Sequence, residues 1–327
     1  EEITRYSKYS SSEYAASQLY DLIWGKVYSI VPKNSSIYFS PAGVLHQMNI
    51  EDLSDMTGER INHKCTIHRV SSTRYLCKNN RQSGTCAALF GNLNYDLDST
   101  LIANNSLEIH DRNHMAHRGY SGAINNSAPK WKNLYNTKEE VESIARILEK
   151  NSYKTSLFED ENGTEASFKN LSGQEYAIIH LATHGFFLKI NEAQRTSYYS
   201  GQTIKYDNLI NPMNRSGILF SGANHSWIGE PLPDYSEDGI LLAEELAALD
   251  FHDTALLILS ACETGLGEIS SEGVSGLQYG FKQAGIDTIV MSLWKVDDEA
   301  TKLLMTNFYK FLLNGETKRQ ASNKAKE

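Results

Sequence analysis

Short apolar runs and amphipathic stretches alternate along the chain, and this alternation predicts which segments are strands and which are helices. In the first part, apolar residues recur on one helical face over residues 13–24, which predicts a helix. Residues 36–40 and 65–70 are rich in β-branched and aromatic side chains and predict short strands. The Gly/Ser/Asn-rich run 79–85 then interrupts the pattern. We therefore expect an N-terminal α/β subdomain over residues 1–82, packed on a larger unit over residues 83–327.

Strand and helix patterns alternate in this second unit, and such alternation predicts a mainly parallel sheet with helices on both faces. Thr137 and Glu140 have the spacing of a capping box for the helix that follows them. Gly276 and Gly280 allow a later helix to approach the sheet closely. The predicted strands are 87–91, 153–158, 176–181, 255–261 and 288–294, and the predicted helices are 137–148, 240–249, 274–284 and one that begins near Asp297 or Asp298.

Two polar segments separate these elements and are predicted as loops. The first fills the space between the strand at 87–91 and the helix at 137–148. The second, 187–232, is rich in Asn, Ser, Gly and Pro and is far longer than an ordinary connection in an α/β unit. We expect the second loop to gate a cleft, and deletion of residues 196–226 would test that idea.

Composition narrows the class of protein. The chain has 327 residues, 40% of them hydrophobic, and a net charge of -9, which argues against a sequence-independent nucleic-acid binder. No apolar stretch approaches the ~18 residues that a membrane span needs. The four cysteines, Cys65, Cys77, Cys86 and Cys262, show no CxxC spacing, which favours a reducing compartment, and we expect the protein to be cytoplasmic. Of these thiols, the first three are predicted to be small core side chains.

Cys262 differs from the other cysteines because it follows an apolar run and precedes a small-residue turn. His184 occupies a matching place after the strand at 176–181. Functional residues of a parallel sheet gather at the carboxyl ends of its strands, so this thiol and this imidazole are predicted to meet over one cleft. The N–H groups of Gly185 and of Cys262 itself would supply an oxyanion hole. Together these features indicate a cysteine peptidase.

Other ionisable side chains have simpler interpretations. His180 lies on the same strand as His184 but about 13 Å from it, too far for a shared metal ion, and is predicted to be a core histidine. His110, His114 and His117 form a cluster in the first polar loop, where we expect no metal site. Neither a metal nor a cofactor is expected elsewhere. The acids at 297–299 follow the last strand on the rim that holds His184, where they either line a pocket or begin a helix.

Seven motifs together resemble the CHAT family of caspase-like cysteine peptidases, a group that includes caspases, gingipains and separase. The motifs are Phe39-Ser-Pro-Ala-Gly-Val-Leu-His46, Ser71-Ser-Thr-Arg-Tyr75, Leu181-Ala-Thr-His-Gly185, Asp238-Gly-Ile-Leu-Leu-Ala-Glu-Glu245, Leu259-Ser-Ala-Cys-Glu-Thr-Gly265, Gly273-Val-Ser-Gly-Leu-Gln278 and Met291-Ser-Leu-Trp-Lys-Val-Asp-Asp298.

The resemblance implies a caspase-like α/β sandwich of three layers and hydrolysis of a peptide bond through a thioester. It assigns His184 and Cys262 as the catalytic dyad, and Gly185 and Cys262 as the oxyanion hole. By similarity to separase, Asp298 would bind a basic P1 side chain, with a hydrophobic P1 as the rival preference. The expected partners are a protein or peptide substrate, such as a gasdermin-like effector in bacterial defence or signalling, and a regulatory protein or upstream domain.

Two other functions compete with a peptidase. A catalytically silent scaffold would keep the fold without the chemistry, and the intact His184, Gly185 and Cys262 weigh against it. A hydrolase or acyltransferase would use the same thiol on a non-peptide substrate. Labelling with a peptide electrophile separates the three, because a scaffold is inert and a non-peptide enzyme reacts slowly.

Overall fold

A computed structural model describes residues 13–70, 84–113, 129–188, 211–233, 235–260, 268–270, 273–292 and 298–326. The chain divides into two compact units, each considered by itself below. The first comprises Glu1–Asn80 with Ile269–Val274, and the second comprises Arg81–Glu268 with Ser275–Glu327. The boundary predicted after residue 82 falls within residues 71–83, outside the described part. Among the described residues, no helix is long and apolar enough to cross a membrane.

The first unit contains a two-stranded parallel sheet and short helices around a small core. The predicted helix and both predicted strands are present, as α2 (Glu13–Ile23), β1 (Ser36–Phe39) and β2 (Thr66–Arg69), and Ser36 pairs with Thr66 in the sheet. The indole N–H of Trp24 donates to the Ile50 carbonyl at 2.8 Å, which ties α2 to the loop segment beneath it. The described residues of this unit also form four short helical segments: α3 (Gly25–Tyr28), two 3-10 turns (Gly43–Gln47 and Ile50–Asp52) and α4 (Ile61–Lys64).

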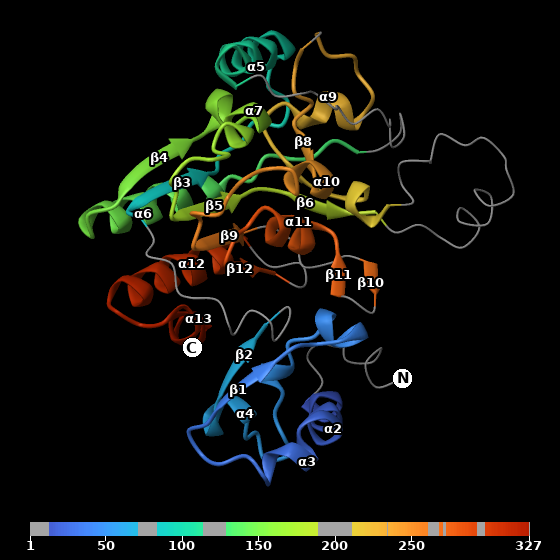
Figure 1. Cartoon of the computed structure of the whole chain (residues 1–327), viewed down its shortest axis with the longest axis vertical. Coiled ribbons are helices and arrows are strands. Elements are labelled where there is room, and N and C mark those ends of the chain that lie inside the picture. Colours follow the sequence, from blue (N-terminus) through green and yellow to red (C-terminus); the bar gives the residue numbers. More distant parts are fainter. Residues whose placement is uncertain are drawn as a thin grey trace, which may run out of the picture. The chain divides into compact units, whose positions relative to one another are not determined.

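The second unit is organised around a five-stranded parallel sheet with the strand order β12-β9-β5-β3-β4 (Figure 1). Each strand coincides with a predicted strand, and the apolar runs of β3, β5 and β9 are continuous because these inner strands are buried on both faces of the sheet. The strands are β3 (Cys86–Phe90), β4 (Lys154–Phe158), β5 (Ile178–Ala182), β9 (Leu256–Ser260) and β12 (Thr288–Met291).

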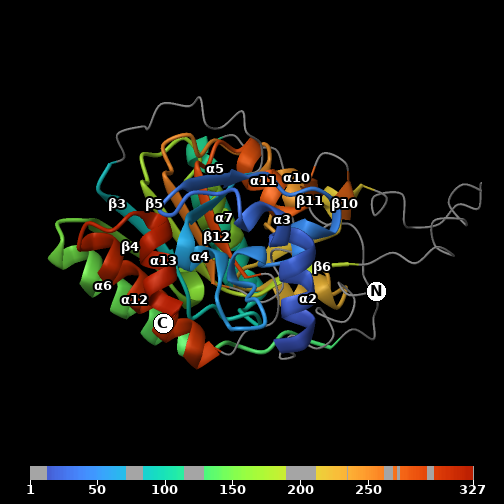
Figure 2. The same cartoon turned by 90° about the horizontal axis from the view of Figure 1, so that it is seen from below.

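Alternate residues of these strands enter two separate cores, which makes the unit a three-layer sandwich. Residues 87, 89, 256 and 258 pack against one group of helices, whereas residues 88, 90, 257 and 259 pack against the other group. Figure 2 shows the first group, α6 (Asn136–Lys150), α12 (Asp298–Leu313) and α13 (Lys318–Lys326), on one side of the strands. The opposite layer contains α7 (Glu165–Lys169), α10 (Ala243–Leu246) and α11 (Leu277–Gln283). The predicted caspase-like α/β architecture is therefore confirmed.

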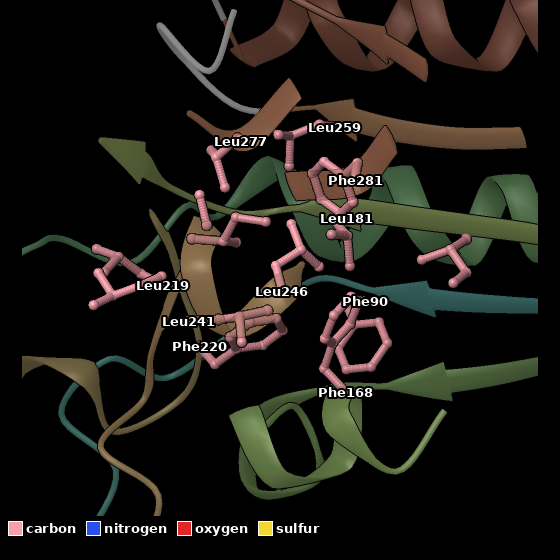
Figure 3. Close-up of a cluster of buried hydrophobic side chains, with 14 of the residues drawn as sticks. Phe90, Phe168, Leu181, Leu219, Phe220, Leu241, Leu246, Leu259, Leu277 and Phe281 are labelled. Carbon is pink, nitrogen blue, oxygen red and sulfur yellow. The ribbon is translucent and has the colours of Figure 1, made fainter. Parts of the chain in front are cut away.

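A small antiparallel sheet extends this second core. It has the order β6-β7-β8, formed by β6 (Gly185–Phe187), β7 (Ser216–Leu219) and β8 (Ile240–Leu242). Leu219 and Leu241 of this sheet converge with Leu181, Leu259 and other buried side chains in one continuous cluster (Figure 3). The remaining described elements are α5 (Ser99–Asn113), α9 (Ala223–Trp227), β10 (Glu268–Ser270), β11 (Gly273–Ser275) and two 3-10 turns (Asp160–Asn162 and Pro212–Asn214).

The prediction of an uninterrupted polar loop before residue 137 is wrong, because α5 lies within it. Asp98 caps this helix: its carboxylate accepts hydrogen bonds from the hydroxyl and the amide of Thr100, and these bonds lower the pKa of the carboxyl. The face that α5 buries is narrow and partly polar, so the apolar residues of this segment do not recur with the spacing that identifies a helix in the sequence. Its buried side chains are Ile102, Ala103 and Ser106.

The predicted capping box at the start of α6 is also wrong. The Thr137 hydroxyl accepts a hydrogen bond from the Asn92 N–H at 2.9 Å instead of capping the helix. The Glu140 carboxylate turns into the core and binds His180 Nε2 at 3.0 Å. Both side chains thus serve long-range contacts that a local sequence pattern does not reveal.

The second predicted loop, 187–232, contains β7 and α9 and is therefore not one structureless segment. All four residues of β7 are buried, and Gly222, with φ of +88°, begins α9 at a place where a Cβ would lie 2.1 Å from Ile102 Cδ1. Deletion of residues 196–226 would remove this strand from the core. The gating hypothesis is consequently confined to residues 189–210, which lie outside the described residues.

Two predicted helices have different bounds. Residues 240–249 begin as β8, because they pair with β7, and become helical only at α10. Residues 274–284 begin as β11 and become helical at α11. Gly280 permits a close approach as predicted, but to α10 rather than to the sheet: a Cβ there would lie 2.7 Å from the Ala243 carbonyl oxygen.

Candidate functional site

His184 lies two residues beyond the end of β5, where the chain leaves the parallel sheet and enters the antiparallel sheet as β6. Strand β5 occupies the middle of the five-stranded sheet, so its carboxyl end lies at the centre of that edge. The His184 side chain is half-buried. The structure thus places His184 at the strand end where the sequence predicted it.

A chain of hydrogen bonds fixes the backbone at this junction. The His184 N–H donates to the Tyr95 hydroxyl at 3.2 Å, and that hydroxyl lies 2.8 Å from Thr183 Oγ1. The Thr183 hydroxyl in turn donates to the Leu219 carbonyl at 2.5 Å, so the Tyr95 hydroxyl is the donor to Thr183. Thr183 and Tyr95 are both buried. Buried hydrogen bonds of this kind are costly to leave unmade, which holds His184 in place.

The imidazole of His184 is held by a backbone carbonyl and two aromatic rings. Its Nε2 lies 2.8 Å from the Lys132 carbonyl oxygen. Because a carbonyl only accepts, Nε2 carries the proton, and Nδ1 is the nitrogen able to act as a base. The Tyr95 ring centroid lies 5.1 Å from the imidazole centroid, and the Trp131 ring centroid lies 4.9 Å from it. These contacts fix both the tautomer and the plane of the ring.

The N–H of Gly185 points away from β7, as the pairing register requires. The Leu219 N–H donates to the His184 carbonyl at 2.9 Å, so these two residues form a hydrogen-bonded pair. Gly185 is paired with Ile218 one position further, where the residues of an antiparallel ladder do not bond to one another. Since β6 lies at the edge of the sheet that the described residues form, the Gly185 N–H is directed outward from that sheet.

Cys262 lies outside the described residues, but the strand that leads to it does not. Strand β9 runs parallel to β5, and its last residue, Ser260, is the register partner of Ala182. Adjacent strands lie about 4.8 Å apart. Cys262 and His184 each follow these paired residues by two positions, and the predicted meeting of their side chains stays a prediction.

Of the other cysteines, Cys65 has the predicted core role. Cys65 is buried, its thiol donates to the Ile61 carbonyl at 3.3 Å, and burial raises the pKa of the thiol. Cys86 is half-buried in β3, and Cys77 lies outside the described residues. A raised pKa leaves less reactive thiolate at neutral pH.

The remaining candidates divide between core and unplaced residues. His180 is fully buried, with Glu140 at Nε2 and the Tyr309 hydroxyl 3.4 Å from Nδ1, so the prediction of a core histidine is confirmed. Asp298 is the first residue of α12, and both predicted roles for its side chain stay predictions.

The predicted histidine cluster is only partly placed. His110 lies within α5 rather than in a loop, and His114 and His117 lie outside the described residues. No group of three or more potential metal ligands gathers among the residues that the structure describes.

A buried ionic cluster accounts for the acidic motif that ends at Glu245. The Lys169 ammonium lies 2.8 Å from Glu165, 2.8 Å from Glu237 and 3.1 Å from Glu245. Burial lowers the pKa of Lys169, but the carboxylates outweigh this effect and raise it overall. Burial, assisted by the charge of Glu165, raises the pKa of Glu245 to about 7. Glu165 also accepts a hydrogen bond from the Gly239 N–H, so the cluster positions the start of β8.

Sequence reasoning missed the residues that surround His184. Tyr95 and Trp131 lie in a segment predicted as polar loop, and Asn224 lies in the other. Large aromatic side chains within polar stretches were the available signal, because such residues are usually buried. A backbone carbonyl such as that of Lys132 leaves no signal in the side-chain pattern.

Comparison with known proteins identifies the family of the chain. No curated protein sequence matches the chain. The family model of the CHAT domain matches residues 13–327, which is nearly the whole chain. The chain therefore belongs to the CHAT domain family, which is related to the caspase-like cysteine peptidases.

Proposed function

We propose that this protein is a cysteine endopeptidase that cleaves a protein or peptide substrate, with Cys262 as nucleophile and His184 as general base and acid. The observation that carries the proposal is the state of His184 at the carboxyl end of the central strand. Its Nε2 donates to the Lys132 carbonyl, which directs the basic Nδ1 to proton transfer.

The reaction follows from these assignments. Nδ1 takes the proton from the Cys262 thiol, and the thiolate sulfur attacks the carbonyl carbon of the scissile peptide bond. The tetrahedral intermediate collapses to a thioester as the C–N bond breaks, and the imidazolium gives its Nδ1 proton to the departing amine. Nδ1 then takes a proton from water, whose oxygen attacks the thioester carbon. The C–S bond breaks to release the acid product, and the imidazolium returns its Nδ1 proton to the Cys262 sulfur.

The Lys132 carbonyl assists this cycle electrostatically. When Nδ1 is also protonated, the imidazolium retains its Nε2–H bond to that carbonyl, which stabilises the positive charge. The pairing of Ala182 with Ser260 supports the partnership with Cys262, because each reactive residue follows one of these paired residues by two positions.

The pairing of β6 with β7 supports the assignment of the Gly185 N–H as an oxyanion donor. This N–H is directed away from β7 and follows His184 immediately, and the Cys262 N–H is the second donor in this proposal. Removal of one such donor from an oxyanion hole typically lowers kcat by about 10²–10³-fold. We also assign Asp298 to a basic P1 side chain, since it follows the last strand of the same sheet edge.

Labelling with a peptide acyloxymethyl ketone, followed by intact mass measurement and peptide mapping, tests the proposal. Wild type is expected to gain one adduct at Cys262, while Cys65, Cys77 and Cys86 stay unmodified. Cys262→Ala is expected to gain none, and His184→Gln to react much more slowly. An unreactive wild-type protein would favour a scaffold, and labelling that does not depend on His184 would remove the proposed dyad.

A further inference from the structure

Asn224 is fully buried in the first turn of α9, and its side-chain amide pairs with the backbone of one distant residue. The Trp131 N–H donates to Asn224 Oδ1 at 2.8 Å, and Asn224 Nδ2 donates to the Trp131 carbonyl at 3.0 Å. This two-point contact fixes the peptide units on both sides of Trp131. One of them is the unit that leads into Lys132.

The segment that Asn224 holds supplies two of the contacts to the catalytic histidine. The Trp131 ring lies against the His184 imidazole, and the next residue, Lys132, provides the carbonyl that accepts from Nε2. The backbone of Asn224 also contacts the second aromatic residue beside the imidazole, because its N–H donates to the Tyr95 carbonyl at 3.0 Å. The Tyr95 ring in turn lies against the imidazole with an interplanar angle of 41°, and its hydroxyl accepts from the His184 N–H.

We propose that Asn224 is a positioning residue for catalysis, which holds the Lys132 carbonyl on His184 Nε2 and thereby keeps Nδ1 as the basic nitrogen. This role rests on the proposed peptidase function. Asn224 acts through Trp131 and Lys132 and does not itself contact the reacting atoms. Displacements of about 1 Å at a catalytic group lower rates by roughly 100-fold. The pair of hydrogen bonds between Asn224 and Trp131, called the clasp below, would therefore affect the rate by fixing the position of the imidazole.

The chemistry of the contact requires an amide. Asparagine presents a donor and an acceptor side by side, which matches the N–H and the carbonyl of Trp131. An ionised aspartate offers only acceptors and repels the Trp131 carbonyl, whereas alanine offers neither group. Asn224→Ala and Asn224→Asp, the latter at a pH where its carboxyl is ionised, therefore both break the clasp.

His225 provides a matched control on the same turn of α9. Its Nε2 donates to the Leu97 carbonyl at 2.9 Å and its Nδ1 binds Glu230 at 2.7 Å, so it anchors the helix without contacting Trp131. His225→Ala removes a comparable number of hydrogen bonds from α9. It leaves the clasp between Asn224 and Trp131 intact.

The test is the imidazole tautomer of His184, read by long-range ¹H–¹⁵N NMR of full-length protein labelled at histidine and assigned with His184→Gln. Wild type and His225→Ala are expected to show the Nε2–H tautomer. Both Asn224 variants are expected to lose it, and to lower kcat by roughly 10- to 100-fold with little change in KM. Thermal melting identifies folded variants, and Asn224→Asp carries the test if the alanine variant does not fold.

A folded Asn224 variant that keeps the Nε2–H tautomer would overturn the proposal, as would loss of the tautomer in His225→Ala. The NMR readout needs no substrate, so it decides the role of Asn224 even if wild type cleaves no peptide. In that case the peptidase function fails on its own, and the two failures remain distinguishable.

Discussion

The buried cluster around Lys169 predicts that stability falls as the pH rises through neutrality. Three carboxylates share one ammonium, and burial raises the pKa of Glu245 to about 7 from the ordinary glutamate value of 4.5. Between these two values the folded protein holds a proton that the unfolded chain has released. Folding is therefore favoured at the lower pH, and this contribution is lost as the pH rises from 4.5 through 7.

The magnitude follows from the size of the shift. One pKa unit corresponds to ~1.4 kcal/mol, so a shift of this size makes the free energy of unfolding about 2–3 kcal/mol lower at about pH 8.5 than at about pH 5. The side chain of Glu245 is 16% exposed, so solvent screens the charge only weakly.

Substitution isolates this contribution from the other titrating groups. Glu245→Gln removes the titrating carboxyl, so its stability relative to wild type should improve by about 2–3 kcal/mol as the pH rises across the same range. Urea unfolding curves of the two proteins at both pH values provide the measurement. A difference in stability that does not change with pH would refute the raised pKa of Glu245.

A second substitution tests the role of the Lys169 ammonium within the same cluster. Lys169→Met leaves three buried carboxylates without their ammonium and should lower the free energy of unfolding by about 3–5 kcal/mol at neutral pH. Part of this loss should be recovered at lower pH, as the carboxylates become protonated. A stable Lys169→Met protein at high pH would contradict this account of the cluster.

Further predictions concern the site and its frame. Tyr95→Phe removes the hydroxyl that accepts from the His184 N–H and should cost about 1–3 kcal/mol in urea unfolding; an unchanged midpoint would show that this bond contributes nothing. Gly239→Ala, at φ of +77° and with the new Cβ 2.7 Å from Ala223 N, should cost at least about 1–3 kcal/mol, and equal melting temperatures would contradict it. Asp298→Asn should lower kcat/KM for peptides with P1 Arg by roughly 10- to 100-fold and spare those with P1 Leu; equal losses for both would remove Asp298 from the pocket.

The inner strands of the central sheet were predictable because burial on both faces requires a continuous apolar run in each of them. β3 and β9 are examples, and their residues alternate between two cores. β7 was not predictable, since its four residues, which include Gly217, become a strand only between β6 and β8. α5 was not predicted because its buried face includes Ser106, a polar residue that interrupts the helical spacing of apolar positions.

The same distinction applies to the candidate site. His184 was predictable from its position after a strand and before a glycine. Its supports were not, because the Lys132 carbonyl, the Tyr95 hydroxyl and the Asn224 amide come from segments 40 or more residues away and have no shared local pattern. Only the fold brings them together around the imidazole.

The central claim is that Cys262 and His184 hydrolyse peptide bonds, and profiling cleavage of a peptide library tests it most directly. Wild type should cleave a defined set of sequences, and Cys262→Ala and His184→Gln should cleave none of them. Equal cleavage by wild type and Cys262→Ala would contradict the account.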